Sequence, residues 1–377
     1  MHATDGQSTV NDRQSPYVLP PDLPVPIDDG ACVHLARAAL PPIELVSTAG
    51  DRVKLSGLSS PAVLFFYPRT GVPGQPPSLG YKGEEWDSIP GARGCTPQSC
   101  GFRDLHARFR ELGIGVYGVS TNTTEHQREF RARNHVPFEF LSDAGLALTR
   151  ALNLPTFEFP VESGGPSTLL ARAAWHTEPD ALGVPRIVKV WYPVFPPDKN
   201  AATVLAWLER RAAVRVRPRD ASDDTFVRAE LEKHWHQTRI WSIGRAFEAD
   251  HLPAFVAEVD GPQGPERAGL ATYDVNHGSY QCEVVTLSSR RENAGVATRL
   301  LEAVENAARA ARCTRIFLTT TNDNVKALGF YQTRGWNLAA LHKGNVAEAR
   351  KRKPMIPRVG HHGIVVRDEL ELELWLE

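Results

Sequence analysis

The chain has 377 residues, which is too long for one ordinary hydrophobic core, so two domains are expected. Its 43 basic and 44 acidic residues give a net charge of −1, which excludes a general electrostatic attraction to nucleic acid or anionic membranes. No apolar run approaches the roughly 18 residues of a membrane span. Residues 1–31 lack the pattern of a secretory signal, so we expect a flexible Pro-rich tail, part of which could pack as an irregular arm, on a cytoplasmic protein.

The residues after this tail, 32–215, alternate apolar runs that predict strands with amphipathic runs that predict helices. A strand pair around the turn at 49–51 comes first. The expected strands that follow are 61–68, 113–121, 138–143, 169–177 and 187–194, and the expected helices are 96–112, 126–135, 144–153 and 201–212. This alternation predicts an α/β sheet with crossover helices. Residues 69–94 are rich in Gly and Pro and predict a long loop, which is often functional.

The composition shifts to Arg, Pro and Asp over 214–224, which predicts a domain boundary near 216–222 and a second domain over 223–377. That domain is expected to contain an antiparallel meander flanked by helices. The expected strands are 240–247, 254–261, 267–276, 279–288, 313–321 and 370–376, and the expected helices are 226–236, 291–312 and 327–335.

Five cysteines are too few for a disulfide scaffold, and the number is odd. In a reducing compartment a close pair is more typical of catalysis or of metal binding than of a structural bridge. Cys95 and Cys100 form such a pair within GCTPQSCGFRD, and we interpret the other three as buried small apolar residues.

Cys95 lies where the long loop becomes a helix, so the N–H groups of the first turn can favour its thiolate. A thiolate that attacks a peroxide becomes a sulfenic acid, and a second thiol condenses with that acid to form a disulfide. In an intact helix the Cα atoms of Cys95 and Cys100 would be roughly 8.6 Å apart, whereas a disulfide tolerates only about 7 Å. Oxidation therefore requires the first turn to unwind, and thiol–disulfide exchange would reset it.

Several short segments carry a family resemblance: Phe65-Phe66-Tyr67-Pro68, Gly94-Cys95-Thr96, Cys100 and Phe102-Arg103-Asp104. Together they resemble the peroxiredoxins, and within these the bacterioferritin-comigratory or Q type, over roughly 32–212. The resemblance implies a thioredoxin-like fold, hydroperoxide substrates, a peroxidatic role for Cys95, a resolving role for Cys100 and a thioredoxin-like reductant.

The family usually places a Pro, a Thr or Ser and the cysteine in one short loop, but here about twenty extra residues separate Thr70 from Pro90. The residue three before Cys95 is Ala92 rather than Thr. Either Thr70 folds back to supply the hydroxyl, or Thr96 or a backbone group replaces it.

The family also uses an Arg from a later strand to polarise the peroxide. Arg172 is expected in this role, with Arg93 as the alternative; Arg172 could instead be an ordinary salt-bridge partner. Two other interpretations of the cysteines are half of a zinc site and a redox-inert scaffold.

In the second half, the strand over 280–289 leads through a Gly-containing turn into a long helix. Free N–H groups at such a helix start, together with the helix dipole, favour a bound phosphate, although many strand–helix junctions contain a glycine without binding one. The expected phosphate-binding residues are Arg290, Arg291, Asn293, Ala294, Gly295, Val296 and Ala297.

The turn and the downstream segment TTTNDNVKALGFYQTRGW resemble the GCN5-related N-acetyltransferases, abbreviated GNAT, over roughly 223–377. In that family the turn reads Gln or Arg, two residues, Gly, one residue, then Gly or Ala. Gly295 and Ala297 match, whereas Glu292 occupies the first position and Arg290 and Arg291 just upstream could offset its charge. The resemblance implies an α+β fold that binds acetyl-CoA.

The resemblance also implies roles for three side chains. Tyr331 is expected as the general acid, Asn324 as an amide contact to the cofactor and Glu283 as a general base, directly or through water. Tyr331 could equally be a core aromatic residue, and Glu283 an exposed strand carboxylate. The acceptor would be a small-molecule or peptide amine.

The sequence as a whole therefore predicts an α/β protein in which a thioredoxin-like peroxiredoxin domain precedes a GNAT-fold domain, with no nucleic acid or membrane partner. Two alternatives stay open. The second domain could sense acetyl-CoA or bind a partner without catalysis, or Cys95 could be a redox sensor that regulates the acetyltransferase.

Overall fold

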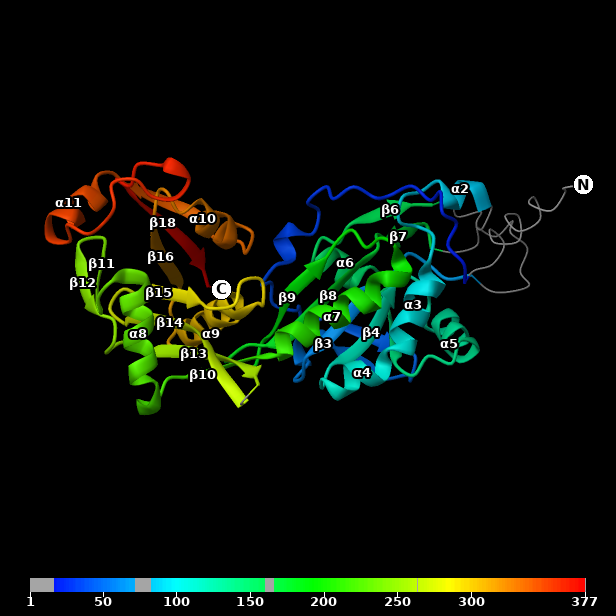
Figure 1. The fold of residues 1–377 in the computed structure, drawn as a ribbon. Helices are drawn as coiled ribbons and strands as arrows, with labels where there is room; N and C mark the ends of the chain where they lie inside the picture. The colour runs from blue at the N-terminus through cyan, green and yellow to red at the C-terminus, as the bar shows by residue number, and fades with distance from the viewer. Residues whose placement is uncertain (1–16, 72–82, 160–165, 263, 377) are drawn as a thin grey trace, which may run out of the picture. The chain divides into compact units, whose positions relative to one another are not determined.

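The computed structural model describes residues 17–71, 83–159, 166–262 and 264–376 (Figure 1). The chain divides into two compact units, Met1–Leu208 and Glu209–Glu377, each with its own sheet. The described part of the chain contains no helix with the length and apolarity needed to span a membrane. Residues 1–16 of the expected tail and residues 72–82 of the expected loop lie outside the described residues.

The first unit is built on a seven-stranded sheet of order β2-β1-β5-β4-β3-β8-β9. Its strands are β1 Glu44–Ser47, β2 Arg52–Lys54, β3 Ala62–Phe66, β4 Gly115–Ser120, β5 Glu139–Ser142, β8 Ala173–Pro179 and β9 Pro185–Trp191. All five residues of β3 are buried because β3 lies between parallel β4 and antiparallel β8 with a core on each face.

Helices cover both faces of this sheet (Figure 1). Those that pack on it are α3 Cys95–Asp104, α4 His106–Glu111, α5 Thr124–Arg133, α6 Ala147–Ala151 and α7 Asn200–Ala212, whereas α2 Gly83–Asp87 packs in a separate small cluster with Phe159 and Leu169. The core on the α3 face is aromatic, and the Phe65 and Phe102 rings stack with centroids 4.4 Å apart. This contact fixes α3 against the central strand and so fixes the position of Cys95.

The stretch 169–177 differs from the single strand expected there. It forms β7 Thr168–Leu170, which pairs with β6 Thr156–Glu158, and then β8. The break falls at Ala171 and Arg172, where the chain leaves one small sheet for the central one. Arg172 therefore lies outside both strands, although its side chain is buried.

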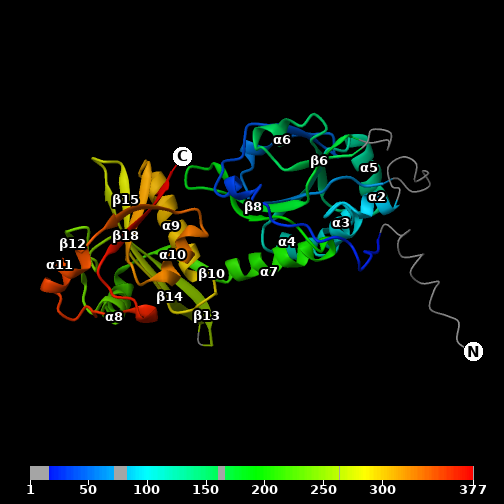
Figure 2. The ribbon, with the colours of Figure 1, turned by 90° about the horizontal axis from the view of Figure 1, so that it is seen from above.

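The second unit has a seven-stranded sheet of order β10-β13-β14-β15-β16-β18-β17. Figure 2 labels β10, β13, β14, β15 and β18 of this sheet. The bounds are β10 Val214–Pro218, β13 Ala254–Gly261, β14 Gly264–Asn276, β15 Gln281–Ser289, β16 Arg315–Thr321, β17 Asn337–His342 and β18 Glu369–Trp375. The helices are α8 Asp224–Trp235, α9 Val296–Ala310, α10 Val325–Gln332 and α11 Asn345–Arg352. Alternate strand residues face α9 or α8, which gives a separate core on each face.

Two expectations for this unit need correction. The stretch 216–222, expected to separate the domains, lies inside the unit: Val214–Pro218 pairs with β13, and Asp220 caps the turn before α8. Its Arg-rich composition reflects the exposed face of an edge strand. Residues 240–247, expected as one strand, form a hairpin of β11 Arg239–Ser242 and β12 Arg245–Glu248, because Ile243 and Gly244 adopt the positive φ angles of a tight turn.

Candidate functional site

Cys95 is the first residue of α3 and is buried. Gly94 precedes it with φ 107°, a left-handed conformation that favours glycine. A Cβ at Gly94 would also overlap Pro197 Cγ and lie 2.9 Å from Leu19 Cδ2. Packing around Gly94 thus sets the abrupt change from loop to helix and places the sulfur at the positive end of the helix dipole.

The Arg172 guanidinium lies against this sulfur, with its Nη2 donating to Cys95 Sγ over 3.2 Å. Its Nη1 also donates to Gln98 Oε1 on the first turn of α3. Backbone carbonyls take the remaining bonds, from Nε to Gly91 O at 3.0 Å and from Nη2 to Ala92 O at 2.9 Å and Arg93 O at 3.2 Å. A buried cation held by carbonyls is preorganised to stabilise a thiolate, because it cannot turn away to pair elsewhere.

Gln98 connects this guanidinium to α7. Its side chain is fully buried, and its Nε2 donates to Asn200 Oδ1 over 2.9 Å. Tyr67 belongs to the same core as Cys95, and burial raises the pKa of its phenol, with the Cys95 charge adding to the shift. Tyr67 therefore stays protonated at neutral pH.

Cys100 lies further along the same helix, which is unbroken from Cys95 to Asp104, and both thiols are free. Its side chain is partly buried, and this burial raises the pKa of the Cys100 thiol while Arg103 opposes the shift. The structure is thus that of a reduced pair in a folded helix.

In the second unit, β15 and β16 are parallel neighbours that separate. They pair only where Gln281–Glu283 faces Arg315–Phe317, although β15 runs to Ser289 and β16 to Thr321. Beyond Glu283 the facing edges of β15 and β16 form no backbone hydrogen bonds with each other, although both strands lie inside the sheet. Backbone groups of this kind need partners, so the diverging edges can receive an extended ligand.

The turn after β15 leads into the 15-residue helix α9 through Gly295, whose φ is 82°. A Cβ built at Gly295 meets nothing within 4 Å, so the space beside the helix start is open. Arg290 Nε donates to Glu230 Oε1 at 2.6 Å and Arg291 Nη2 to Glu266 Oε2 at 3.0 Å. The turn thus combines free first-turn N–H groups, open space and nearby guanidinium groups, which together suit a phosphate.

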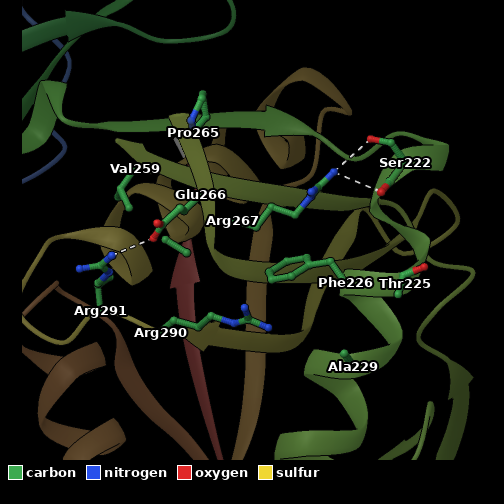
Figure 3. A pocket seen from close by; sticks show the side chains of 11 residues that line it. Ser222, Thr225, Phe226, Ala229, Val259, Pro265, Glu266, Arg267, Arg290 and Arg291 are labelled. Atoms are coloured by element: carbon green, nitrogen blue, oxygen red, sulfur yellow. Dashed lines mark hydrogen bonds and ion pairs between the residues drawn. The ribbon is translucent and has the colours of Figure 1, made fainter. Parts of the chain in front are cut away.

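A pocket of about 570 Å³ adjoins this turn (Figure 3). The start of α8, the β13–β14 hairpin and the end of β15 contribute its walls. Three guanidinium groups line it, those of Arg267, Arg290 and Arg291, and each also pairs with a carboxylate. The Arg290 guanidinium lies 4.7 Å from the centre of the Phe226 ring, so the pocket has both cationic and apolar surface.

Glu283 lies at the last paired position before β15 and β16 separate, and only 3% of it is exposed. Burial raises its pKa to about 7, while Ser242 and Arg245 act in the opposite direction and Asp274 and Glu371 add to the increase. A carboxyl group that titrates near neutral pH can accept or hold a proton under ordinary conditions.

Comparison with known proteins decides what these two units are. The Redoxin family model matches residues 35–173, and the model of the Acetyltransferase (GNAT) family matches residues 217–336. The chain thus carries a match to each family, over separate residues. It joins a redoxin domain of the peroxiredoxin Q type to a GNAT acetyltransferase domain, each of mixed α/β structure.

Each individual relative covers less than half of the chain. Uncharacterized protein YdhI of Bacillus subtilis is 41% identical over 138 residues, which is 37% of this chain and 83% of that protein. Chloroplastic peroxiredoxin Q of Sedum lineare is 28% identical over 170 residues, 45% of this chain and 75% of that protein. The solved structure of peroxidoxin BcpB from Mycobacterium tuberculosis is 23% identical with a TM-score of 0.35 and covers 46% of this chain and 96% of its own.

The redoxin domain brings Arg172 to Cys95 but gives Thr70 other partners. The Thr70 hydroxyl lies 3.0 Å from His126 Nε2, and its N–H donates to Asn122 Oδ1 at 3.2 Å. Arg93, the alternative to Arg172, directs its Nη1 to Asp87 Oδ1 at 3.1 Å. Thr96, one expected replacement for the Thr70 hydroxyl, follows Cys95 directly in the chain. The backbone carbonyl of Ala92 accepts from Cys95 Sγ at 3.7 Å.

In the GNAT domain, Asn324 follows β16 and caps α10. Its Oδ1 accepts from Ala327 N at 3.2 Å, and its Nδ2 donates to Thr320 Oγ1 at 3.1 Å. Tyr331 lies on α10 beside Trp336, and burial raises the pKa of its phenol. Both residues follow β16, whereas Gly295 follows β15, the other strand of the diverging pair.

Sequence reasoning missed Gln98 and Arg245. Gln98 lies within the quoted motif, and its position one turn after Cys95 was the available signal. Arg245 offered no signal, because its approach to Glu283 depends on how the β11–β12 hairpin folds over the sheet.

Proposed function

We propose that the redoxin domain reduces hydroperoxides, with Cys95 as the attacking thiolate and Arg172 as the cation that stabilises it. The observation that carries this proposal is the 3.2 Å contact from Arg172 Nη2 to Cys95 Sγ at the N-terminus of α3. The sulfur attacks one peroxide oxygen, the O–O bond breaks and the alcohol leaves with a proton. Cys95 becomes a sulfenic acid.

Cys100 then attacks the sulfenic sulfur, water leaves and a disulfide forms. Because α3 is continuous from Cys95 to Asp104, its first turn must open before the two sulfurs meet. Opening would also relieve the burial that raises the pKa of Cys100, so the same motion that brings the resolving thiol close would make it a better nucleophile. A thioredoxin-like dithiol would return the pair to its reduced state.

Among the residues expected to act in the redoxin site, Thr70 has the least support. Its bonds to His126 and Asn122 favour a structural role. We therefore assign the peroxide-polarising function to Arg172 and to the backbone N–H groups that open α3.

The test is peroxide consumption by the full chain with a thioredoxin system. Wild type should consume peroxide catalytically, and Cys95→Ser should reduce the rate to background. Cys32→Ser is the matched control, because burial raises the pKa of Cys32 to about 12 and keeps its thiol protonated. Retained turnover in Cys95→Ser, or equal loss in both variants, would remove the proposal.

For the GNAT domain we propose acetyl-CoA-dependent transfer to an amine. The residues present fit this cofactor: α9 opens at a glycine with free space beside it, and β15 and β16 diverge just before that turn. The turn from Arg290 to Ala297 would hold the pyrophosphate, and the diverging edges would hold the extended arm. Bound acetyl-CoA supplies the acetyl group as a thioester.

Two side chains of this domain would then accept and donate protons during the transfer. Glu283 would accept a proton from the amine, directly or through water, because its pKa of about 7 suits a base at neutral pH. Tyr331 would hold a proton for the departing thiolate, since burial keeps its phenol protonated. Asn324, at the start of α10, would contact the cofactor if its amide were released from the cap.

Calorimetric titration of the full chain with acetyl-CoA tests this second proposal. We expect saturable binding in the micromolar range, and the absence of binding at millimolar ligand would overturn it. Acetyl transfer measured with the cysteine pair reduced and then oxidised decides whether Cys95 also acts as a sensor. Equal rates would exclude that regulatory alternative.

A further inference from the structure

Asp274 and Glu283 face each other on neighbouring strands of the GNAT sheet. They are direct register partners of β14 and β15, so their side chains emerge on the same face. Like charges in directly opposite positions destabilise a sheet. Two facing carboxylates are stabilised when a cation lies between them.

Glu283 has unmet hydrogen-bonding capacity. Its Oε1 is buried and has no hydrogen-bond partner within the described part of the chain. The next acidic group on this face, Glu371, is instead satisfied by Arg315 and by His342 Nε2 at 2.7 Å. The unsatisfied oxygen therefore belongs to Glu283, whose register partner on β14 is Asp274.

One cation already bridges these two carboxylates. Arg245 Nη2 donates to Asp274 Oδ2 at 3.0 Å, and its Nη1 lies 3.7 Å from Glu283 Oε2. The Arg245 side chain is 53% exposed, so the contact with Asp274 gains little from burial and water can compete for it.

The Arg245 side chain comes from a separate structural element. The β11–β12 hairpin forms its own two-stranded sheet, and among the described residues it adds no strand to the main sheet. Its side-chain link to β16 is a hydrogen bond of 3.0 Å between Ser242 Oγ and Thr319 Oγ1. Arg245 can thus withdraw without breaking any ladder of the main sheet.

We propose that Asp274 and Glu283 form the binding site for the ammonium group of a primary alkylamine acceptor, and that Arg245 occupies this site as a tethered competitor until the amine displaces it. The inference rests on the proposed acetyl transfer and names its substrate class. An amine with an adjacent carboxylate would be disfavoured, because Asp274 and Glu283 would repel that carboxylate. A neutral alcohol of the same length would gain no ionic contact.

The test is calorimetric titration of the full chain, with CoA present, using n-butylamine as the probe and n-butanol and 2-aminobutanoate as comparisons. Butylamine should bind more tightly than either comparison. Asp274→Asn should weaken butylamine binding about tenfold or more, as expected for the loss of one hydrogen bond to a charged group. Arg245→Gln should tighten it severalfold, because the competitor is removed.

Arg239→Gln is the matched control, since Arg239 lies on the same hairpin but pairs with Glu248 at 3.3 Å. It should leave butylamine binding unchanged. Weaker or unchanged binding in Arg245→Gln, or full affinity in Asp274→Asn, would overturn the inference. If the binding pattern holds but no amine is acetylated, the cation site stands and the proposed transfer fails; if transfer occurs without the pattern, the inference alone fails.

Discussion

In the redoxin domain a buried thiol lies against a buried guanidinium, whereas in the GNAT domain a buried carboxyl group lies opposite another carboxylate. Arg172 is held by three backbone carbonyls and Gln98, so its charge is fixed before any substrate arrives. The carboxyl Oε1 of Glu283 is unsatisfied within the described residues, and the bridging Arg245 is half exposed.

The difference shows two ways of preparing a reactive group. The first site has its cation already in place, and its proposed cycle requires the first turn of α3 to open, because Cys95 and Cys100 share one helix. The second site keeps its structure, and we propose that a cationic ligand neutralises its two carboxylates. Variants at each site should therefore fail in different ways.

The largest expected effect is the loss of repeated turnover in Cys100→Ser. Without a resolving thiol, one equivalent of peroxide should still be reduced, and Cys95 should then remain oxidised. Stopped-flow measurement would show a normal first phase followed by no steady state with thioredoxin. A normal steady state would mean that another thiol resolves Cys95, and Cys32→Ser serves as the control.

Glu283→Gln should lower acetyl transfer by about 100-fold or more if the carboxylate is the general base. Since the folded-state pKa is about 7, the wild-type rate should rise as pH increases through 7, and the variant should lose this rise. An unchanged pH profile would exclude the role.

The raised pKa of Glu283 also makes the stability of the folded state depend on pH. It lies above the ordinary value of 4.5, so the folded state holds the proton more tightly, and the stabilising contribution is lost as pH rises through about 7. Glu283→Gln should therefore raise stability relative to wild type at pH 8.5 but not at pH 4. Urea unfolding at the two pH values measures this difference.

Arg172→Gln should slow the first oxidation step about 10- to 100-fold, the range expected for a lost hydrogen bond to a charged group. It should also destabilise the domain, because the carbonyls of Gly91, Ala92 and Arg93 lose their donor. Stopped-flow oxidation and urea unfolding would report the two effects separately. Arg93→Gln, which removes the pair with Asp87 instead, should leave the oxidation rate nearly unchanged.

Gly295→Ala should produce the smallest effect. A non-glycine residue at φ 82° costs about 1–2 kcal/mol, and its Cβ enters the open space beside α9. Acetyl-CoA binding should weaken about tenfold, measured by calorimetry. Gly329→Ala is the matched control, because Gly329 also has open space but lies inside α10, where alanine favours the helix.

The sequence by itself determined the two families, the alternation of elements and the position of Cys95 at a helix start. Those features depend on local patterns: β3 is a continuous apolar run, α9 is strongly amphipathic, and the two motifs are short and contiguous. The same patterns misplaced the boundary near 216–222, because an edge strand with one exposed face has the polar composition of a linker.

Only the tertiary structure decided which side chains meet. Arg172 reaches Cys95 across 77 positions, and Arg245 reaches Glu283 through a hairpin that folds over the sheet. The raised pKa of Glu283 likewise depends on burial. The alternation of residues along β15 predicts the sheet face on which Glu283 lies, but it does not predict that the residue is buried. Such contacts are long-range, and a local pattern does not encode them, because the partner is chosen by how strands pair and helices pack.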